Sequence, residues 1–516
     1  MEVIIVTIVV YLLLMVVIGV IFSKKNNDVG DFYLGGRKLG PIVTAMSAEA
    51  SDMSSYLLMG LPGLALLCGC AEVGWTAIGL GVGTYLNWLI VAKRLRVYSH
   101  RIGAITIPDF FSKRYGENKN VILGISALII LIFFIPYTAS GFSACGKLFE
   151  QLFGWDYHAA MMISAAIIIL YTSIGGFLAA STTDLIQSIV MTTALIVVVI
   201  FGVNSAGGLD NVIENAKGLN GYLTLFENHN AADNTASPFG FINIISTAAW
   251  GLGYFGMPHI LLRFMAIGDK NKIKTSRRIA SVWVVISMGI AIFIGIIANA
   301  LLKQGSIAID LSNPATASSN SETAIIKMAF LMNENGIFAA VFAGLIFAGI
   351  LACTMSTADS QLLAASSSAS ENLLKGVFKV KLSEKMSMLV ARLVLMVIAV
   401  VAIIIAWDKD SSIFSVVSFA WAGFGATFGP VMLLALLWKR SNKYGAIAGL
   451  AAGGIMIFVW KFAIRTLGGA FDIYELLPAF IIALLADVIV SLATKAPDKE
   501  ITDAYEGYQA EMKERA

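Results

Sequence analysis

Charged residues are scarce in this sequence. Asp, Glu, Lys and Arg make up 13% of the 516 residues, whereas hydrophobic residues make up 58%. Soluble domains carry roughly 25% charged residues, so the composition excludes a chain of soluble domains. It indicates a polytopic protein embedded in a membrane, with lipid as its surroundings and no nucleic acid as a partner.

Cysteine and histidine are also rare, and neither forms a chemical motif. The four cysteines, Cys68, Cys70, Cys145 and Cys353, lack the spacing of a metal site, and the first two are too close in sequence for a structural disulfide. The four histidines are scattered, and no HExxH, GxSxG or phosphate-loop pattern is present. These absences argue against an enzyme. A sensor is disfavoured because the tail after Ala496 is too short for a signalling domain, and a channel because no pore-loop signature occurs.

Thirteen stretches are long and apolar enough to cross a bilayer as helices. They are residues 3–22, 41–66, 68–92, 120–146, 157–179, 182–204, 239–262, 278–302, 325–362, 386–406, 411–438, 443–464 and 474–494. The first stretch has neither a basic segment before it nor a small-residue cleavage site. We therefore expect it to remain as a span and not to be removed as a signal peptide.

The basic residues test this map, because Lys and Arg collect in the cytoplasmic loops of membrane proteins. Most of the 36 Lys and Arg fall in alternate loops, starting with Lys24 and Lys25 after the first span. Those on the opposite side are Lys147, Lys217, Lys303, Lys327, Lys409, Lys461 and Arg465. The pattern predicts thirteen transmembrane helices in the plasma membrane, with the N-terminus outside and the C-terminus in the cytoplasm.

The order of the spans predicts six regions of an all-α membrane protein. They are 1–40 (first helix and cytoplasmic loop), 41–204 (first five-helix repeat), 205–238 (extracellular loop), 239–438 (second five-helix repeat), 439–494 (two C-terminal helices) and 495–516 (a solvated cytoplasmic tail). Equivalent helices of the two repeats are five spans apart, and this odd number inverts their topology. Inverted repeats are common in secondary transporters.

Residues 45–59, AMSAEASDMSSYLLM, place the carboxylates Glu49 and Asp52 inside a predicted span. A charge at bilayer depth costs at least ~2.5–3.5 kcal/mol. Ser, Gly and Pro around Asp52 weaken the helix, which predicts two half-helices whose meeting point turns carbonyl groups toward a cavity. The alternative is a kinked helix in which Asp52 only pairs with a neighbouring helix. In the other half of the chain, residues 348–370 are similarly rich in Ser, Thr and Ala.

Several runs of sequence resemble the sodium:solute symporter family, above all its proline branch. They are DFYLGGRKLGP (31–41), ASDMSSYLLMGLPG (50–63), WGLGYFGMPHILLRFMA (250–266), LACTMSTADSQLL (351–363) and AWAGFGATFGPV (420–431). The similarity continues, in order, over nearly all thirteen spans. It implies a leucine-transporter-type core of two inverted five-helix repeats, with one helix before the core and two after it.

The resemblance also implies a sodium ion, Na+, between the broken second span and the ninth span. Its implied oxygen ligands are the carbonyls of Ala50, Met53 and Cys353 and the hydroxyls of Ser356 and Thr357. Such neutral oxygens suit a hard monovalent cation. Asp52 lies beside this site and would attract the cation, either as a ligand or by orienting Ser54. The alternative for Ser356 and Thr357 is hydrogen bonding to their own helix.

A substrate site beside the ion is implied in the same way. Its implied residues are Ser54, Ser55, Tyr56, Tyr137, Trp250, Tyr254 and Pro258. A small zwitterion with an apolar ring needs a partner for each charge and an aromatic wall for the ring. Trp250 and Tyr254 are four residues apart and would share one face of a helix. The alternative is ordinary aromatic packing.

Some positions depart from the family's proline pattern, namely Glu49, Ser55, Tyr56, Asp359 and Asp487. Asp359, with Ser360 and Asp184, resembles a position at which some family members hold a second sodium ion. Two carboxylates at one place repel unless a cation or a proton lies between them. We therefore predict a second cation or a proton there, with an ion pair to Arg263 or Arg392 as the alternative.

These features favour a sodium-coupled symporter that imports L-proline by alternating access, without covalent chemistry. The departures at Ser55 and Tyr56 leave the solute open. The alternative function is sodium- or proton-coupled symport of another small solute, such as another amino acid, pantothenate or a sugar acid.

Overall fold

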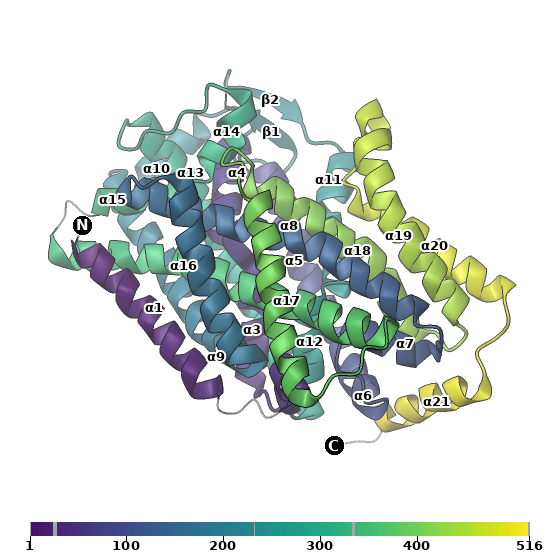
Figure 1. Ribbon diagram of the computed structural model, residues 1–516. Coiled ribbons are helices and arrows are strands. Elements are labelled where there is room, and N and C mark those ends of the chain that lie inside the picture. Colours follow the sequence, from purple (N-terminus) through teal and green to yellow (C-terminus); the bar gives the residue numbers. More distant parts are fainter. Residues whose placement is uncertain (1, 24–27, 232, 333–335, 514–516) are drawn as a thin grey trace.

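The computed structural model describes residues 2–23, 28–231, 233–332 and 336–513, so the predicted cytoplasmic Lys24 and Lys25 lie outside the described residues. The described part is helical except for one hairpin (Figure 1). The helices of its first half are α1 (Glu2–Ser23), α2 (Val29–Leu34), α3 (Pro41–Ser55), α4 (Leu61–Cys68), α5 (Cys70–Asn87), α6 (Lys93–Arg101), α7 (Ile107–Tyr115), α8 (Val121–Phe153), α9 (Tyr157–Ser205) and α10 (Leu209–Lys217).

The second half of the chain contains the remaining helices. They are α11 (Phe241–Ala248), α12 (Pro258–Ala266), α13 (Ile273–Lys303), α14 (Pro314–Ser321), α15 (Ala324–Met332), α16 (Ile337–Ser367), α17 (Glu384–Ile405), α18 (Ile413–Leu437), α19 (Lys443–Val459), α20 (Leu476–Ala493) and α21 (Lys499–Lys513). Short 3-10 or π turns are η1 (Gly35–Arg37), η2 (Tyr56–Gly60), η3 (Trp88–Ala92), η4 (Ala249–Phe255), η5 (Lys270–Lys272), η6 (Ser368–Val377), η7 (Trp460–Ile464), η8 (Arg465–Leu467) and η9 (Gly469–Phe471).

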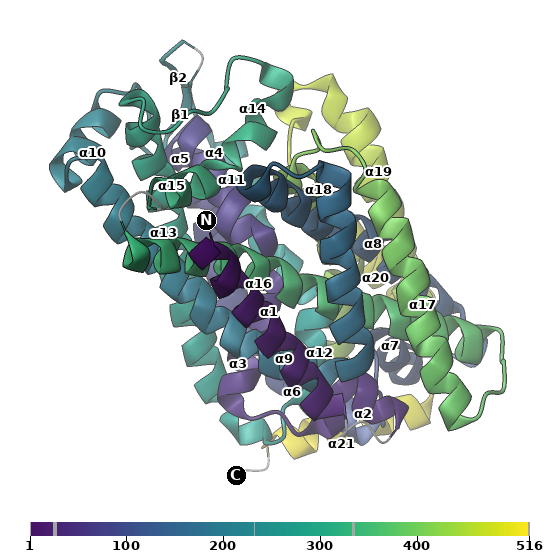
Figure 2. The ribbon, with the colours of Figure 1, turned by 60° about the vertical axis from the view of Figure 1, so that its left-hand side comes forward.

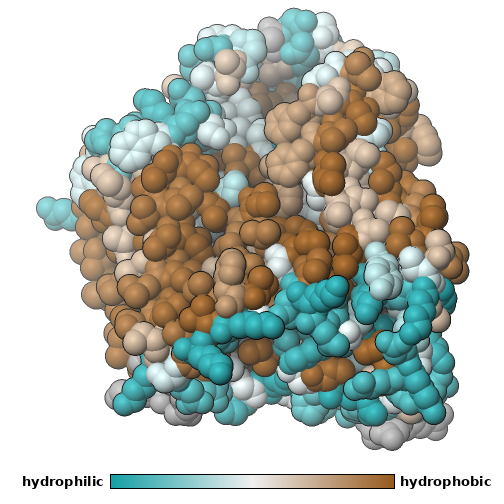
Figure 3. All heavy atoms as spheres, turned by 45° about the vertical axis from the view of Figure 1, so that its right-hand side comes forward, coloured by the Kyte–Doolittle hydropathy of each residue, from teal (hydrophilic) through white to brown (hydrophobic). Residues whose placement is uncertain are grey.

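Ten helices of the described residues are long and apolar enough to cross a membrane by length and composition. Their outward faces carry large apolar side chains, such as Val17, Val82 and Leu485, each more than half exposed. In Figure 3 these faces merge into a broad hydrophobic band with hydrophilic residues at its lower edge. A band of this kind is stable only when lipid covers it, and the protein is a multi-pass membrane protein.

Three predicted spans have different boundaries in the structure. The chain over 157–204 forms α9, which is broken at Gly176 (φ 66°, ψ −168°), whereas the sequence placed the division between residues 179 and 182. Gly tolerates this positive φ, and hydropathy does not register it. The predicted span 325–362 is divided between α15 and α16, and its residues 333–335 lie outside the described residues.

The polar excursion at 205–238 contains ordered structure. It forms α10 and an antiparallel hairpin of β1 (Glu227–Asn230) and β2 (Thr235–Pro238), in which Glu227 is opposite Pro238. The hairpin lies at the top of Figures 1 and 2, while α6 and α21 lie at the opposite end. Helix α1 begins in the half that carries the hairpin, so the start of α1 and helix α21 lie toward opposite ends of the molecule.

A buried ion pair joins helices near the hairpin end. The ammonium of Lys147, at the end of α8, lies 3.2 Å from the Glu322 carboxylate, which follows α14. Glu322 also accepts hydrogen bonds from the backbone N–H groups of Ile413 (3.2 Å) and Phe414 (3.0 Å) at the start of α18. An acidic side chain at a helix N-terminus satisfies unpaired N–H groups and the helix dipole. Glu322 thus ties α18 to α8.

Two contacts organise the opposite end. Arg37, between α2 and α3, donates hydrogen bonds to the carbonyls of Met265 (2.7 Å) and Ala104 (2.5 Å). Burial, followed by the nearby charge of Arg96, lowers the pKa of the Arg37 guanidinium to about 10, so it stays charged at neutral pH. Arg37 therefore holds the end of α12 in place.

The C-terminal segment is not the solvated tail that the sequence predicted. Tyr505 and Tyr508 lie on one face of α21, and the Tyr508 ring stacks on Tyr98 of α6 with centroids 4.4 Å apart. Both tyrosine hydroxyls donate to the carbonyl of Leu436, at 3.3 Å and 2.7 Å. Aromatic residues three apart give this charged helix a buried stripe, which explains why it packs against the protein.

Candidate functional site

The predicted interruption of residues 45–59 is present and falls at one residue. Helix α3 ends at Ser55, but Ser54 has φ 46° and ψ −169°, outside the helical region, and the chain continues as the π turn η2 before α4. A positive φ is costly for a residue with a side chain and is kept where the surroundings enforce it. The break takes Ser54 out of the helical ladder, and its carbonyl accepts a hydrogen bond from the Cys353 thiol.

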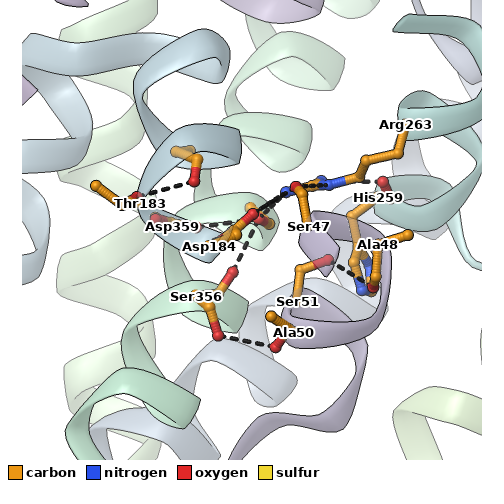
Figure 4. A network of polar contacts seen from close by, with 12 residues as sticks. Ser47, Ala48, Ala50, Ser51, Thr183, Asp184, His259, Arg263, Ser356 and Asp359 are labelled. Atoms are coloured by element: carbon orange, nitrogen blue, oxygen red, sulfur yellow. Dashed lines mark hydrogen bonds and ion pairs between the residues drawn. The ribbon is translucent and has the colours of Figure 1, made fainter. Parts of the chain in front are cut away.

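Helix α16 lies against this break, as predicted. The Ser356 hydroxyl donates to the carbonyl of Ala50 at 2.8 Å, across 306 residues of sequence (Figure 4). Ser356 and Thr357 each also contact the carbonyl of Cys353 at 3.2 Å. The two hydroxyls therefore do form hydrogen bonds within their own helix, and Ser356 reaches the broken helix as well. The Cys353 carbonyl thus lies beside both hydroxyls, and the Ala50 carbonyl lies beside that of Ser356.

Asp52 is 6% exposed and lies one position from Met53, which is also buried. Its Oδ2 accepts a hydrogen bond of 2.6 Å from the Tyr254 hydroxyl, and its backbone carbonyl lies 3.4 Å from the Tyr137 hydroxyl. Within the described part of the chain, Asp52 Oδ1 has no hydrogen-bond partner and no cationic side chain pairs with the carboxylate. One carboxylate oxygen is therefore free to interact with a cation.

A small cavity adjoins Asp52. It has a volume of about 10 Å3, roughly what one water molecule needs. Its lining is Asp52, Met53, Tyr56, Leu80, Tyr137, Trp250, Val417 and Trp421. Tyr56 and Trp250 stack with centroids 5.6 Å apart and an interplanar angle of 19°. The aromatic rings have closed this space, and an amino acid needs more room than it offers.

The predicted substrate residues are only partly gathered around the cavity. Tyr56, Tyr137 and Trp250 line it, and Tyr254 reaches it through Asp52. Ser54 forms the break and Pro258 starts α12, and neither lines the cavity. Ser55 does not line it either, and its buried hydroxyl has no hydrogen-bond partner among the described residues.

Trp250 and Tyr254 do not form the predicted wall on one helical face. Both lie in the 3-10 segment η4, which interrupts α11 and α12. With three residues per turn, residues four apart point in different directions. Trp250 therefore stacks on Tyr56, while Tyr254 bonds Asp52.

Helix α18 supplies part of the site through Trp421, a residue that was not among the predicted substrate contacts. Trp421 lines the cavity, donates from Nε1 to the carbonyl of Trp250 at 2.8 Å and packs perpendicular to Tyr254 with centroids 5.0 Å apart. Gly253 is required beside it, because a Cβ there would lie 2.0 Å from the Trp421 indole nitrogen. A single indole within the small-residue run AWAGFGATFGPV was the signal that could have identified this position.

The second predicted cluster is also assembled. Asp184 Oδ2 accepts hydrogen bonds from Ser47 (2.6 Å) and from the Arg263 guanidinium (3.0 Å), which also contacts Ser360 at 2.5 Å (Figure 4). Asp359 instead accepts from the hydroxyls of Tyr171 (2.8 Å) and Ser360 (3.0 Å). The predicted ion pair with Arg263 is therefore present for Asp184, whereas Asp359 has no ion pair among the described residues.

The bundle of apolar spans, interrupted beside oxygen donors and a buried carboxylate, is the architecture of a helical membrane transporter. The sequence model of the sodium:solute symporter family matches residues 32–453. The chain belongs to this family, whose members are transporters and not enzymes.

Curated relatives are similar along nearly their whole length. The sodium/proline symporter of Haemophilus influenzae is 41% identical over 506 residues, covering 96% of each chain. The high-affinity proline transporter PutP of Bacillus subtilis is 39% identical over 496 residues, covering 96% of this chain and 99% of the relative. The sodium/proline symporter of Salmonella typhimurium is 40% identical over 494 residues, covering 95% and 92%.

Solved structures share the fold. A Na+-coupled sialic acid symporter in a substrate-bound outward-open state superposes with a TM-score of 0.76 at 19% identity, covering 96% of this chain and 99% of that one. The nucleobase-cation-symport-1 family transporter MHP1 superposes with a TM-score of 0.54 at 15% identity, covering 92% and 98%.

Proposed function

We propose that the protein is a symporter that imports L-proline together with Na+ by alternating access. Relatives named as sodium/proline symporters, about 40% identical over nearly the whole chain, support the solute and the ion. The observation that carries the proposal is the broken helix α3–α4. Its Ala50 carbonyl contacts the Ser356 hydroxyl of α16, and it carries a buried carboxylate, Asp52, with one unpartnered oxygen. Both Na+ and proline are transported substrates.

The ion site in this proposal lies between α3 and α16. Its ligands are the carbonyls of Ala50, Met53 and Cys353 and the hydroxyls of Ser356 and Thr357. A Ser hydroxyl that now donates to Ala50 can instead turn a lone pair toward a cation. Asp52 adds a negative charge where little water screens it. The fit rests on these buried oxygens and on the unpartnered Asp52 Oδ1.

Proline would occupy the space between the two broken helices. Tyr56, Tyr137 and Trp250 would bound its apolar ring, with Tyr254 holding Asp52 in place. The remaining predicted contacts, Ser54, Ser55 and Pro258, would come into reach only when the site opens. Because the cavity now has room for about one water molecule, binding requires η4 and α18 to separate from η2.

The binding of Na+ and the binding of proline are coupled in this proposal because the two sites share one short segment. Ala50 and Met53 belong to the proposed ion site, while Asp52 and Tyr56 adjoin the proposed solute site, all within two turns of one interrupted helix. An ion that orders this segment lowers the cost of binding the solute, and the solute must favour the ion by the same factor.

A second site for a cation or a proton is proposed at Asp184, Asp359 and Ser360. Arg263 neutralises Asp184, so one carboxylate of the pair is left without a counter-charge. A buried carboxylate in this state takes up a proton or a cation. An ion pair at Asp184 and a bound proton or cation at Asp359 are therefore compatible with each other in this cluster.

The topology proposed here has thirteen crossings. Ten are single apolar helices, α9 counts twice because it breaks at Gly176, and the two interrupted segments α3–α4 and α11–α12 complete the number. The inverted repeats are 41–204 and 239–438, and each begins with an interrupted helix. Residues 1–40, 205–238, 439–494 and 495–516 are the flanking regions, with the N-terminus outside and the C-terminus in the cytoplasm.

Uptake by proteoliposomes tests the proposal. Labelled proline should accumulate against its gradient when an inward Na+ gradient is imposed, and a panel of unlabelled solutes should compete in the order set by their likeness to proline. Accumulation driven by a proton gradient alone, or competition led by pantothenate or a sugar acid, would instead select the alternative function.

A further inference from the structure

An apolar groove lies on the outer surface between α5 and α13, outside the proposed transport site. Its volume is about 620 Å3, within the range of about 300–1,000 Å3 that ligand pockets have. Small residues keep it open, among them Gly81 on α5 and Gly289 on α13. A Cβ added at Gly289 would meet no atom within 4 Å. The groove is therefore accessible from the apolar surroundings of the protein.

The walls of the groove are long aliphatic side chains that face outward. Ile78, Val82 and Val285 are 44%, 54% and 59% exposed. In the hydrophobic belt of a membrane protein, such a groove between two helices fits a flexible hydrocarbon chain. The chain can follow the irregular surface and fill space that a rigid helix packed on the same surface would leave empty.

One end of the groove is basic. Arg277 lies one turn before the groove-lining Ser281 on α13, and its guanidinium carbon is 5.2 Å from the ring centroid of Tyr85, another lining residue. Arg277 Nε and Ser281 Oγ have no hydrogen-bond partner among the described residues. Within the same residues no carboxylate pairs with Arg277, nor with the exposed Arg278 beside it. This end of the groove thus has positive charge that no carboxylate balances, and two buried polar atoms without a protein partner.

We propose that the groove binds one anionic phospholipid, with an acyl chain between α5 and α13 and the phosphate at Arg277. The apolar length and the basic end match the two parts of such a lipid. Tyr85 stacks beside the guanidinium and lies where aromatic side chains meet lipid headgroups. In the proposed topology this end faces the cytoplasmic leaflet.

The groove shares a wall with the transport site. On its other side, α5 packs so closely against η4 that a Cβ at Gly83 would lie 2.3 Å from the carbonyl of Gly251. Asn87, also on α5, donates to the carbonyl of Tyr254 at 3.0 Å. A lipid that restrains α5 would therefore act on the segment that carries Trp250 and Tyr254.

Lipid binding is tested on the purified full-length protein, without reference to transport. Native mass spectrometry compares the apparent affinity for phosphatidylglycerol with that for phosphatidylcholine in the wild type, in Arg277→Gln and in the matched control Arg278→Gln. We expect Arg277→Gln to weaken phosphatidylglycerol binding about fivefold, equivalent to ~1 kcal/mol for one basic residue at an anionic headgroup, and to leave phosphatidylcholine binding unchanged. The control Arg278→Gln should lose clearly less affinity for phosphatidylglycerol.

A second variant tests the acyl-chain part. Gly289→Leu places a side chain in the groove at a position where a Cβ meets no atom within 4 Å. It should weaken binding of both lipids, while thermal unfolding in detergent tests that the variant folds. Equal phosphatidylglycerol binding by Arg277→Gln and the wild type would overturn the proposal, as would an equal loss in Arg278→Gln. If Arg277→Gln does not fold, unchanged lipid binding by Gly289→Leu would overturn it on its own.

Discussion

Replacing Asp52 with asparagine is the sharpest test of the proposed ion site. The change removes one negative charge from a carboxylate that is 6% exposed and keeps its shape. The side-chain amide oxygen of the variant can still accept the hydrogen bond from Tyr254, which is 2.6 Å long for Asp52, so we expect the variant to fold. At an effective dielectric constant of about 20, two unit charges roughly 8 Å apart attract by about 2 kcal/mol, and about 4 kcal/mol at 4 Å.

The smaller of these energies already corresponds to about a 30-fold change in an equilibrium constant. Asp52→Asn should therefore raise the Na+ concentration for half-maximal proline uptake by at least about 30-fold. The assay is initial uptake in proteoliposomes over a series of Na+ concentrations at constant ionic strength.

Tyr254→Phe is the matched control, because it removes the hydrogen bond but keeps the charge. It should shift the half-maximal Na+ concentration by less than Asp52→Asn does. If uptake by Asp52→Asn depends on Na+ as in the wild type, the carboxylate does not act on the ion and the assignment is wrong.

Three further outcomes are expected. Thr357→Ala, which removes one proposed hydroxyl ligand, should raise the half-maximal Na+ concentration while thermal stability falls by only about 1 kcal/mol; an unchanged Na+ dependence would contradict its role. Trp250→Ala should raise the proline concentration for half-maximal uptake more than it alters Na+ dependence, and the reverse order would argue against an aromatic wall for the solute. Lys147→Met leaves the buried Glu322 carboxylate unpaired and should destabilise the protein by about 3–5 kcal/mol; calorimetry or fluorescence-detected unfolding measures this, and Lys147→Met combined with Glu322→Gln should recover part of it.

The sequence was most informative where a local property sufficed. Ser54 lies in a run of small hydroxylated residues, and the helix breaks at that residue. The predicted partners Ala50 and Ser356 come from the two halves of the chain, and the Ser356 hydroxyl lies 2.8 Å from the Ala50 carbonyl. This pairing was predicted from the family resemblance, because no local pattern relates residues 306 positions apart.

The sequence did not predict other features, because they depend on the directions in which side chains point, and local sequence patterns do not determine these directions. The C-terminal segment was predicted to be solvated from its charges, although two tyrosines on one face dock it onto α6. Trp250 and Tyr254 were placed on one helical face by an α-helical spacing that a 3-10 segment does not obey. The place of Trp421 in the site depends on its indole meeting the carbonyl of Trp250, 171 residues earlier in the sequence.

The amino-acid sequence by itself determined that the chain enters a membrane and that one span is interrupted beside a carboxylate, because hydropathy and helix weakness are properties of neighbouring residues. Only the tertiary structure decided that Arg263 neutralises Asp184 but not Asp359, that Tyr254 holds Asp52, and that aromatic rings have closed the cavity. These facts depend on the angles and distances at which separate helices pack, and the same helices packed one turn apart would bring other side chains together.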